Sequence, residues 1–328
     1  MPGSPGQHWS HPIDPFCAAV GRITGKTLLS TAVIPALTLD LSSEALTETN
    51  QAFARLEREL STHGIAVIED GPHFLRLVPT SASASTVAPP LRGAALAALT
   101  NQEVLPSGLV NFPATDVEQV LLIYAELAQR TILRPAVIPR SVIRLITTCP
   151  LNRAEVIYAF ETVLALNGLK VVNDGAHFIQ VIPLGTKASL KLAAPQPLKG
   201  APLFDPGRVP QVTARPVIRP STGWDVEKAR RLFYELLHLR DPRSASADRL
   251  LRFYASLAEK TALPSPKLGG TFTLFTVTTP LTREELMYAI KTTLALNDLA
   301  IIPMEGRSVR LGRPSELDAA AKAPPKSP

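Results

Sequence analysis

The tripeptide Gly25-Lys26-Thr27 is the first pattern in the chain that could carry chemistry. It matches the end of a phosphate-binding loop, in which backbone amides and a lysine hold nucleotide phosphates. The nearest upstream glycine is Gly21, which makes the spacing between the two glycines one residue too short. In the repeats described below, the matching positions are Gln129-Arg130-Thr131 and Glu259-Lys260-Thr261, with the basic residue typical of a helix end. We therefore interpret the tripeptide as a helix end and predict no nucleotide site.

Histidines could bind a metal or transfer protons. His73 and His177 occupy equivalent places in two repeats, but the third repeat has Arg307 there. A metal site needs further His, Cys or carboxylate ligands at suitable spacing, and His8 with His11 near the start does not supply them. We predict that His73 and His177 are cross-strand packing partners on hairpins and that no metal is bound.

The remaining nucleophiles and carboxylates also lack a catalytic arrangement. Cys17 falls on the apolar face of a predicted helix, where a small buried side chain is expected, and Cys149 precedes Pro150 without an activating neighbour. Asp70-Gly71 and Asp174-Gly175 have the chemistry of turns. The sequence contains no serine nucleophile elbow, His-Glu-x-x-His or Gly-x-Gly-x-x-Gly. We predict no catalytic, cofactor-binding or metal-binding residue, no small-molecule substrate, and a protein that is not an enzyme.

Proline and charge mark the linkers between folded parts. The chain has 31 prolines in 328 residues, too many for helices and strands to hold. Seven of them lie between Leu184 and Thr222, together with six basic residues and one acidic residue. This segment therefore carries +5 of a net charge of +6, which leaves the folded parts near neutral and argues against a nucleic-acid groove on them. Thr80 to Pro106 is a second, Ala/Ser/Thr-rich linker.

Membrane and export signals are not readable. No stretch of about eighteen apolar residues occurs, so we predict no transmembrane helix. Met1 to His11 lacks the basic-then-apolar pattern of a secretion signal. Two cysteines, Cys17 and Cys149, argue against a disulfide scaffold or a structural zinc site.

An internal repeat organises the rest of the chain. A shift of 104 residues aligns Thr27 with Thr131, Pro35 with Pro139, Leu60 with Leu164, Gly64 with Gly168, Phe74 with Phe178, and Pro79 with Pro183. A further shift of 130 residues aligns Tyr124-Ala125 with Tyr254-Ala255, Thr131 with Thr261, Tyr158-Ala159 with Tyr288-Ala289, and Leu164 to Asn167 with Leu294 to Asn297. One register kept across helices, a strand and a hairpin indicates three copies of one module.

The middle copy predicts the order of elements. Leu109 to Phe112 is a short strand, and Asp116 begins a helix with apolar positions at the helical period. Val142 to Thr148 is a β-rich run that ends at Pro150. Asn152 with Glu155, like Thr282 with Glu285 in the third copy, forms a capping box at the start of a second amphipathic helix.

A hairpin completes the module. Asn167-Gly168 ends the second helix, and Leu169 to Val172 and His177 to Ile182 flank a turn at Asn173-Asp174-Gly175. The predicted fold is α+β, with a β-α-β-α-β-β unit in which one helical layer packs on one small sheet.

The outer copies are less complete. The first copy keeps the hairpin, with strands from Ile65 to Ile68 and from His73 to Val78, but its opening strand is not legible. In the third copy we favour Phe233 to Leu239 as the opening strand over its inclusion in a helix that begins near Asp225.

The middle and third copies resemble the repeated N-terminal domains of bacterial secretins. The residues that carry the resemblance are Phe112, Tyr124 to Leu127, Thr131-Ile132, Val163 to Leu169, Val171-Val172, Pro280 to Thr282, and Thr293 to Asn297. The first copy is more divergent. Secretins also need a long run of alternating strands for their barrel, and nothing after Pro314 supplies it.

The resemblance implies a fold and a role. Secretin N-terminal domains form rings in the periplasm beneath an outer-membrane barrel in type II secretion, type IV pilus and related machines. It therefore implies a KH-like module, a periplasmic or outer-membrane-associated location, and helices packed against the neighbouring subunit's sheet. The predicted partners are protein components of the secretion or pilus assembly and further copies of the chain.

These inferences divide the chain into six segments. They are a divergent repeat at 10–79, a linker at 80–106, a repeat at 107–184, a basic Pro-rich linker at 185–222, a repeat at 223–313, and a disordered tail at 314–328. The predicted function is a non-enzymatic scaffold for protein transport that acts by ring-type packing of its repeats. The alternative is a KH-like RNA-binding protein, against which stand the near-neutral charge and the absence of a Gly-x-x-Gly loop in all three copies.

Overall fold

The computed structural model describes residues 20–31 except 22, 49–80, 104–186, 244–264, 271–273 and 281–317. It divides into two compact units, one formed by residues 1–128 with 139–170 and the other by residues 129–138 with 171–328. The division passes through the middle copy of the repeat. We describe each unit by itself, and the segment boundaries drawn from the repeat remain predictions.

Each copy contains a three-stranded sheet with the same strand order. The sheets are β1 (Thr27–Ser30), β3 (Phe74–Pro79) and β2 (Ile65–Glu69); β6 (Thr131–Leu133), β10 (Phe178–Pro183) and β9 (Leu169–Asp174); and β12 (Thr261–Ala262), β15 (Ser308–Gly312) and β14 (Ala300–Met304). In every sheet the central strand is the last in sequence, and it runs parallel to the first strand. The predicted hairpins are confirmed, with antiparallel pairing of β2 with β3 and of β14 with β15.

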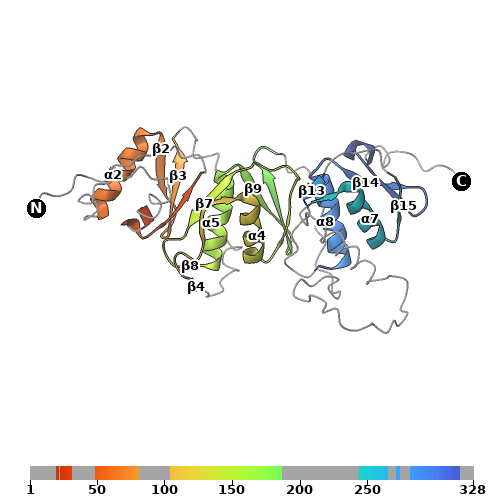
Figure 1. The fold of residues 1–328 in the computed structure, drawn as a ribbon, viewed down its shortest axis with the longest axis horizontal. Coiled ribbons are helices and arrows are strands. Elements are labelled where there is room, and N and C mark those ends of the chain that lie inside the picture. The colour runs from red at the N-terminus through yellow and green to blue at the C-terminus, as the bar shows by residue number, and fades with distance from the viewer. Residues whose placement is uncertain are drawn as a thin grey trace, which may run out of the picture. The chain divides into compact units, whose positions relative to one another are not determined.

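Helices and shorter sheets complete the α+β architecture. The helices are α2 (Thr49–Thr62), α4 (Val117–Ala128), α5 (Arg153–Leu166), α7 (Ala247–Leu257) and α8 (Arg283–Ala295). Three two-stranded sheets pair β4 (Val104–Leu105) with β8 (Leu151–Asn152), β5 (Asn111–Asp116) with β7 (Val142–Ile146), and β11 (Ser244–Ser246) with β13 (Thr271–Thr273). In the third copy α7 and α8 pack on the hairpin β14–β15, and in the first copy α2 lies beside β2 (Figure 1).

The predicted helix starts are confirmed. Asp116 Oδ1 accepts a hydrogen bond of 2.8 Å from the backbone of Glu118. Capping boxes form at the start of α5, between Asn152 and Glu155, and at the start of α8, between Thr282 and Glu285. These caps satisfy amide groups that a helix leaves unpaired in its first turn.

The prediction of one small sheet in each module is wrong. The segment after α4 forms two separate strands, β6 and β7, which belong to different sheets. Pro135 and Pro139 lie between them, and each proline lacks the amide hydrogen that a continuous strand would use. The opening strand of the middle copy is also displaced, from Leu109–Phe112 to β5.

The opening strand of the third copy is only partly tested. The strand directly before α7 is β11, whereas the predicted strand from Phe233 to Leu239 lies outside the described residues. Cys17, His8, His11, Asp225 and most of both predicted linkers also lie outside them. Within the described residues, no helix is long and apolar enough to cross a membrane.

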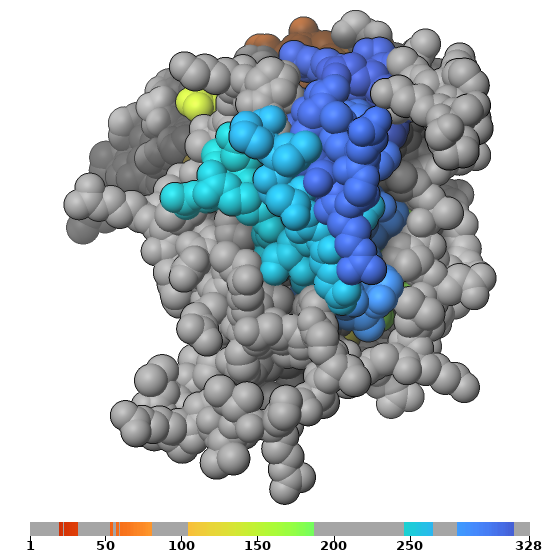
Figure 2. Space-filling view, turned by 90° about the vertical axis from the view of Figure 1, so that its right-hand side faces the viewer, coloured from red at the N-terminus to blue at the C-terminus, as the bar shows by residue number. Residues whose placement is uncertain are grey.

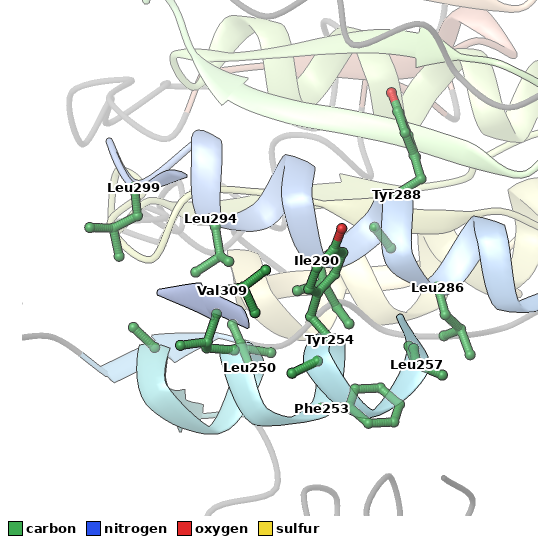
Figure 3. Close-up of a cluster of buried hydrophobic side chains, with 14 of the residues drawn as sticks. Leu250, Phe253, Tyr254, Leu257, Leu286, Tyr288, Ile290, Leu294, Leu299 and Val309 are labelled. Atoms are coloured by element: carbon green, nitrogen blue, oxygen red, sulfur yellow. The ribbon is translucent and has the colours of Figure 1, made fainter. Parts of the chain in front are cut away.

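Small apolar cores hold these layers together. In the first unit, Leu28, Leu60, Ile65, Leu75 and Leu77 form a buried cluster between the sheet and α2. In the third copy, Leu250, Ile290, Leu294 and Val309 converge between α7, α8 and β15 (Figure 3). Burying apolar surface stabilises a fold by about 25 cal/mol per Å², and this is the main stabilising contribution in such cores.

In all three copies, a residue just after the second helix has the left-handed backbone conformation. Gly64 has φ of 71°, Gly168 of 84° and Asp298 of 57°. The predicted cap at Asn167-Gly168 is therefore confirmed. Only glycine adopts this conformation without the steric cost that Cβ adds.

This cap predicts opposite effects for two substitutions. Asp298→Gly is expected to increase the free energy of unfolding by about 0.5–1 kcal/mol, because it relieves a strained backbone. Gly168→Ala is expected to decrease it by about 1 kcal/mol for the converse reason. Urea unfolding followed by circular dichroism measures both, and a loss of stability in Asp298→Gly would contradict the assignment.

Candidate interaction site at the junctions between copies

In the first compact unit, the sheet of the first copy packs on helix α5 of the second. The rings of Phe74 on β3 and Tyr158 on α5 lie 5.2 Å apart between centroids, tilted by 44°. The Tyr158 hydroxyl donates a hydrogen bond to Asp70 Oδ2. Asp70 also lies 3.0 Å from Nε of Arg76, and its side chain is only 5% exposed. We call this contact junction 1.

Glu155 has two tasks at junction 1. One carboxylate oxygen, Oε2, accepts a 2.8 Å hydrogen bond from the Asn152 backbone and so completes the capping box. The other, Oε1, lies 2.7 Å from Nδ1 of His73 in the preceding copy. The residue that begins helix α5 therefore also attaches the helix to the hairpin before it.

At the edge of the same sheet, threonine side chains form hydrogen bonds between the first and second copies. The Thr148 hydroxyl donates a 2.7 Å hydrogen bond to the Lys26 carbonyl, and the Thr148 amide donates to Thr27 Oγ1 at 3.2 Å. Gly21 lies so close that a Cβ at this position would be 2.2 Å from the Thr148 side chain. The two copies thus approach to backbone distance along this edge.

In the second compact unit, the sheet of the second copy packs on helix α8 of the third in the same way. Phe178 and Tyr288 have ring centroids 5.3 Å apart, tilted by 48°. The Tyr288 hydroxyl donates a 2.6 Å hydrogen bond to Asp174 Oδ2. His177 Nδ1 lies 2.8 Å from Oε1 of Glu285, whose side chain is 5% exposed. We call this contact junction 2.

Junction 2 is continuous with the hydrophobic core. Leu133 and Phe178 of the second copy belong to the same buried cluster as the helices of the third copy. Figure 3 shows Tyr288 directed away from α7, while Ile290 and Leu294 on the same helix are directed toward α7 and β15. Helix α8 therefore buries two faces, one in its own copy and one in the preceding sheet.

The two junctions share their residue types but differ in one polar partner. The shared set is Asp, His and Phe on the hairpin with Glu and Tyr on the helix. The carboxylate of Asp70 is joined by Arg76, whereas that of Asp174 accepts a 2.8 Å hydrogen bond from Gln180 Nε2. The arrangement binds one protein surface to another, and each acidic side chain has at least one oxygen directed at a protein donor.

Both junction tyrosines hold their protons strongly. Burial raises the pKa of Tyr158 well above its usual range, and the hydrogen bond to the negative Asp70 raises it further. Burial raises the pKa of Tyr288 in the same way, with Asp174 as the acceptor. Each hydroxyl is therefore a hydrogen-bond donor at neutral pH and not a base.

The interpretation of Gly25-Lys26-Thr27 as a helix end is confirmed. Gly25 has φ of 65°, and its counterparts Gln129 and Glu259 have φ of 51° and 54° in the same left-handed region. Lys26 Nζ lies 3.1 Å from a Glu69 carboxylate oxygen. The tripeptide ends a helix and leads into β1.

The prediction of cross-strand packing for the two histidines is wrong. His73 and His177 contact Glu155 and Glu285 on the helix of the following copy. Within the described residues, no group of three or more His, Cys, Asp or Glu side chains is placed to hold a metal ion. Cys149 is buried, with Sγ 3.5 Å from Thr27 Oγ1.

Asp70 and Asp174 lie beside turns as predicted, but their partners on the helix were missed. A sequence signal for the contact exists. The hairpin residues repeat together with the helical Glu and Tyr of the next copy, and Met304 and Ala54 replace Asp and Tyr at the two outer ends. Because the hairpin residues and the helical residues are present or absent together, the pattern indicates that they contact each other.

Comparisons with known proteins identify no relatives: no family model, no curated protein and no solved structure matches this chain.

The junction hydrogen bonds predict a measurable loss of stability. Tyr158→Phe and Tyr288→Phe keep the ring contacts and remove the hydroxyl donor, so each is expected to cost about 1–2 kcal/mol, because the acceptor is charged. Tyr254→Phe is the matched control, since its hydroxyl donates to no described residue in the structure. Denaturant unfolding checks this, and equal effects in all three variants would contradict it.

The raised tyrosine pKa predicts alkaline sensitivity. Protonated tyrosine is favoured in the folded state, so this stabilisation is complete below the unfolded pKa of about 10 and is lost as pH rises above it. Between pH 8 and about 11, the unfolding midpoint of the wild type should therefore fall more steeply than that of the Tyr158→Phe/Tyr288→Phe double variant. Parallel pH profiles would contradict the prediction.

Proposed function

We propose that this protein is a non-enzymatic scaffold of a secretin-type envelope machine, serving type II secretion or a type IV pilus-like system. The observation that carries the proposal is the pair of matching junctions, in which a sheet of one copy is covered by the second helix of the next. Side chains of types that often act in catalysis contact protein groups there. They include Asp70, His73, Glu155 and Tyr158. This use favours a structural role.

The mode of packing agrees with what the secretin resemblance implies. In that family the helices pack on a neighbouring subunit's sheet, and here helices α5 and α8 pack on the sheet of a neighbouring copy in the same chain. We infer that the modules are KH-like secretin N-terminal domains. Their sides, left free by the junctions, would join equivalent sides of other chains and close a ring in the periplasm.

Mass measurement tests the proposal. Light scattering and native mass spectrometry of the purified chain are expected to give a closed species with a fixed number of copies, and negative-stain images are expected to show annular particles. Ring closure limits growth, so the mass should reach a plateau as concentration increases. A strict monomer at all concentrations would contradict ring-type packing.

RNA binding is tested in parallel. Filter retention of single-stranded RNA is expected to stay at the level of an unrelated near-neutral protein, because the chain outside Leu184 to Thr222 is near neutral in net charge. Strong retention that falls steeply with salt would contradict the scaffold proposal and favour the KH-like RNA-binding alternative.

A further inference from the structure

We propose that the junction residues form a pairing code that limits stacking to the copies within one chain and prevents one chain from stacking end to end on another. The code joins a hairpin bearing Asp, His and Phe to a helix bearing Glu and Tyr. Both interior junctions satisfy it. The corresponding outer surfaces, on the third sheet and on helix α2, do not.

The strand registers define which residues correspond. Thr27 pairs with Phe74 in the first sheet, and Thr131 pairs with Phe178 in the second. In the third sheet Thr261 pairs with Ser308, so a serine occupies the place of the two buried phenylalanines.

The positions of the histidine and the aspartate follow from the same register. The amides of Thr27, Thr131 and Thr261 donate to the carbonyls of His73, His177 and Arg307. Arg307 therefore replaces histidine, and Met304, four residues before Ser308 as Asp174 is before Phe178, replaces aspartate.

The outer face of the third sheet is also partly covered. Arg310 Nη2 lies 2.7 Å from Glu316 Oε2, and the same oxygen lies 3.0 Å from where a Cβ of Gly312 would be. Val78 and Ile182, the counterparts of Gly312, are buried. Figure 2 shows the C-terminal hairpin region at the surface of the third copy, where Met304 is 38% exposed. A polar, self-paired outer face of this kind is typical of a capping repeat.

At the other end of the array, helix α2 lacks the Glu and Tyr of the code. Tyr158 and Tyr288 lie ten residues before Gly168 and Asp298, and the residue at the same distance before Gly64 is Ala54. Ala54 is exposed on α2. Gln51 stands at the place of Glu155 and Glu285. A second chain would therefore meet neither a tyrosine hydroxyl nor a carboxylate at these two positions of α2.

The experiment restores the code at one end, at the other, or at both. The C-terminal variant carries Met304→Asp, Arg307→His, Ser308→Phe and Glu316→Ala, and the helical variant carries Gln51→Glu and Ala54→Tyr. A head-to-tail contact that does not close generates open chains. The doubly restored protein is therefore expected to show a weight-average mass that rises with concentration to at least about twice that of the wild type.

The single-end variants are the matched controls. Each alone is expected to keep the wild-type mass, and an equimolar mixture of the two is expected to form a one-to-one complex of wild-type assemblies. This result is distinct from ring closure, which occurs in the wild type and reaches a plateau. The inference is overturned if the folded double variant keeps the wild-type mass, or if wild-type chains already associate through Arg307 and Ala54 in cross-linking.

A reciprocal variant keeps the inference testable if the restored proteins do not fold. Asp70→Met, His73→Arg and Phe74→Ser give junction 1 the residues of the outer face. Hydrogen exchange at β2 and β3 is expected to become faster by at least about tenfold, because the hairpin loses its cover, while α7 keeps its protection. Unchanged exchange at β3 would overturn the code.

Discussion

A three-stranded sheet has two faces, and the need to cover both is the constraint on which the arrangement of this protein depends. In the first copy, Leu75 and Leu77 on β3 are directed into the copy's own core, while Phe74 and Arg76 on the same strand are directed at helix α5. Strand side chains alternate between faces, so a strand with buried residues on both sides requires two partners. The sheets of the first and second copies are therefore covered on both faces only when the next copy is in place.

This constraint explains why the boundary between the two compact units passes through the middle copy. The strands β6 and β10 of that copy share a core with α8, whereas α5 is packed on the first sheet. A repeat array in which each module contacts its neighbours has this property, because the interfaces between modules contribute to stability in addition to the module interiors. The boundaries of the sequence copies therefore do not coincide with the boundaries of the compact units.

The sequence predicts those features that local chemistry decides. The capping boxes at Asn152 and Thr282, the left-handed position at Gly168 and the hairpins follow from residues a few positions apart, and they are where the pattern places them. The separation of β6 from β7 and the contact of His73 with Glu155 depend on pairing between distant segments. Hydrophobic periodicity gives a strand but does not say which sheet receives it.

The polar pairs inside the junctions act on register more than on total stability. A buried carboxylate such as Asp70 costs free energy to remove from water, and Arg76 with the Tyr158 hydroxyl approximately offsets that cost. A helix shifted by one turn would leave the carboxylate without the tyrosine hydroxyl, and the loss of a hydrogen bond to a charged acceptor costs about 1–2 kcal/mol. Asp174 meets Gln180 and Tyr288 by the same logic. The apolar rings thus supply the attraction, and the acidic residue selects the helix position that is accepted.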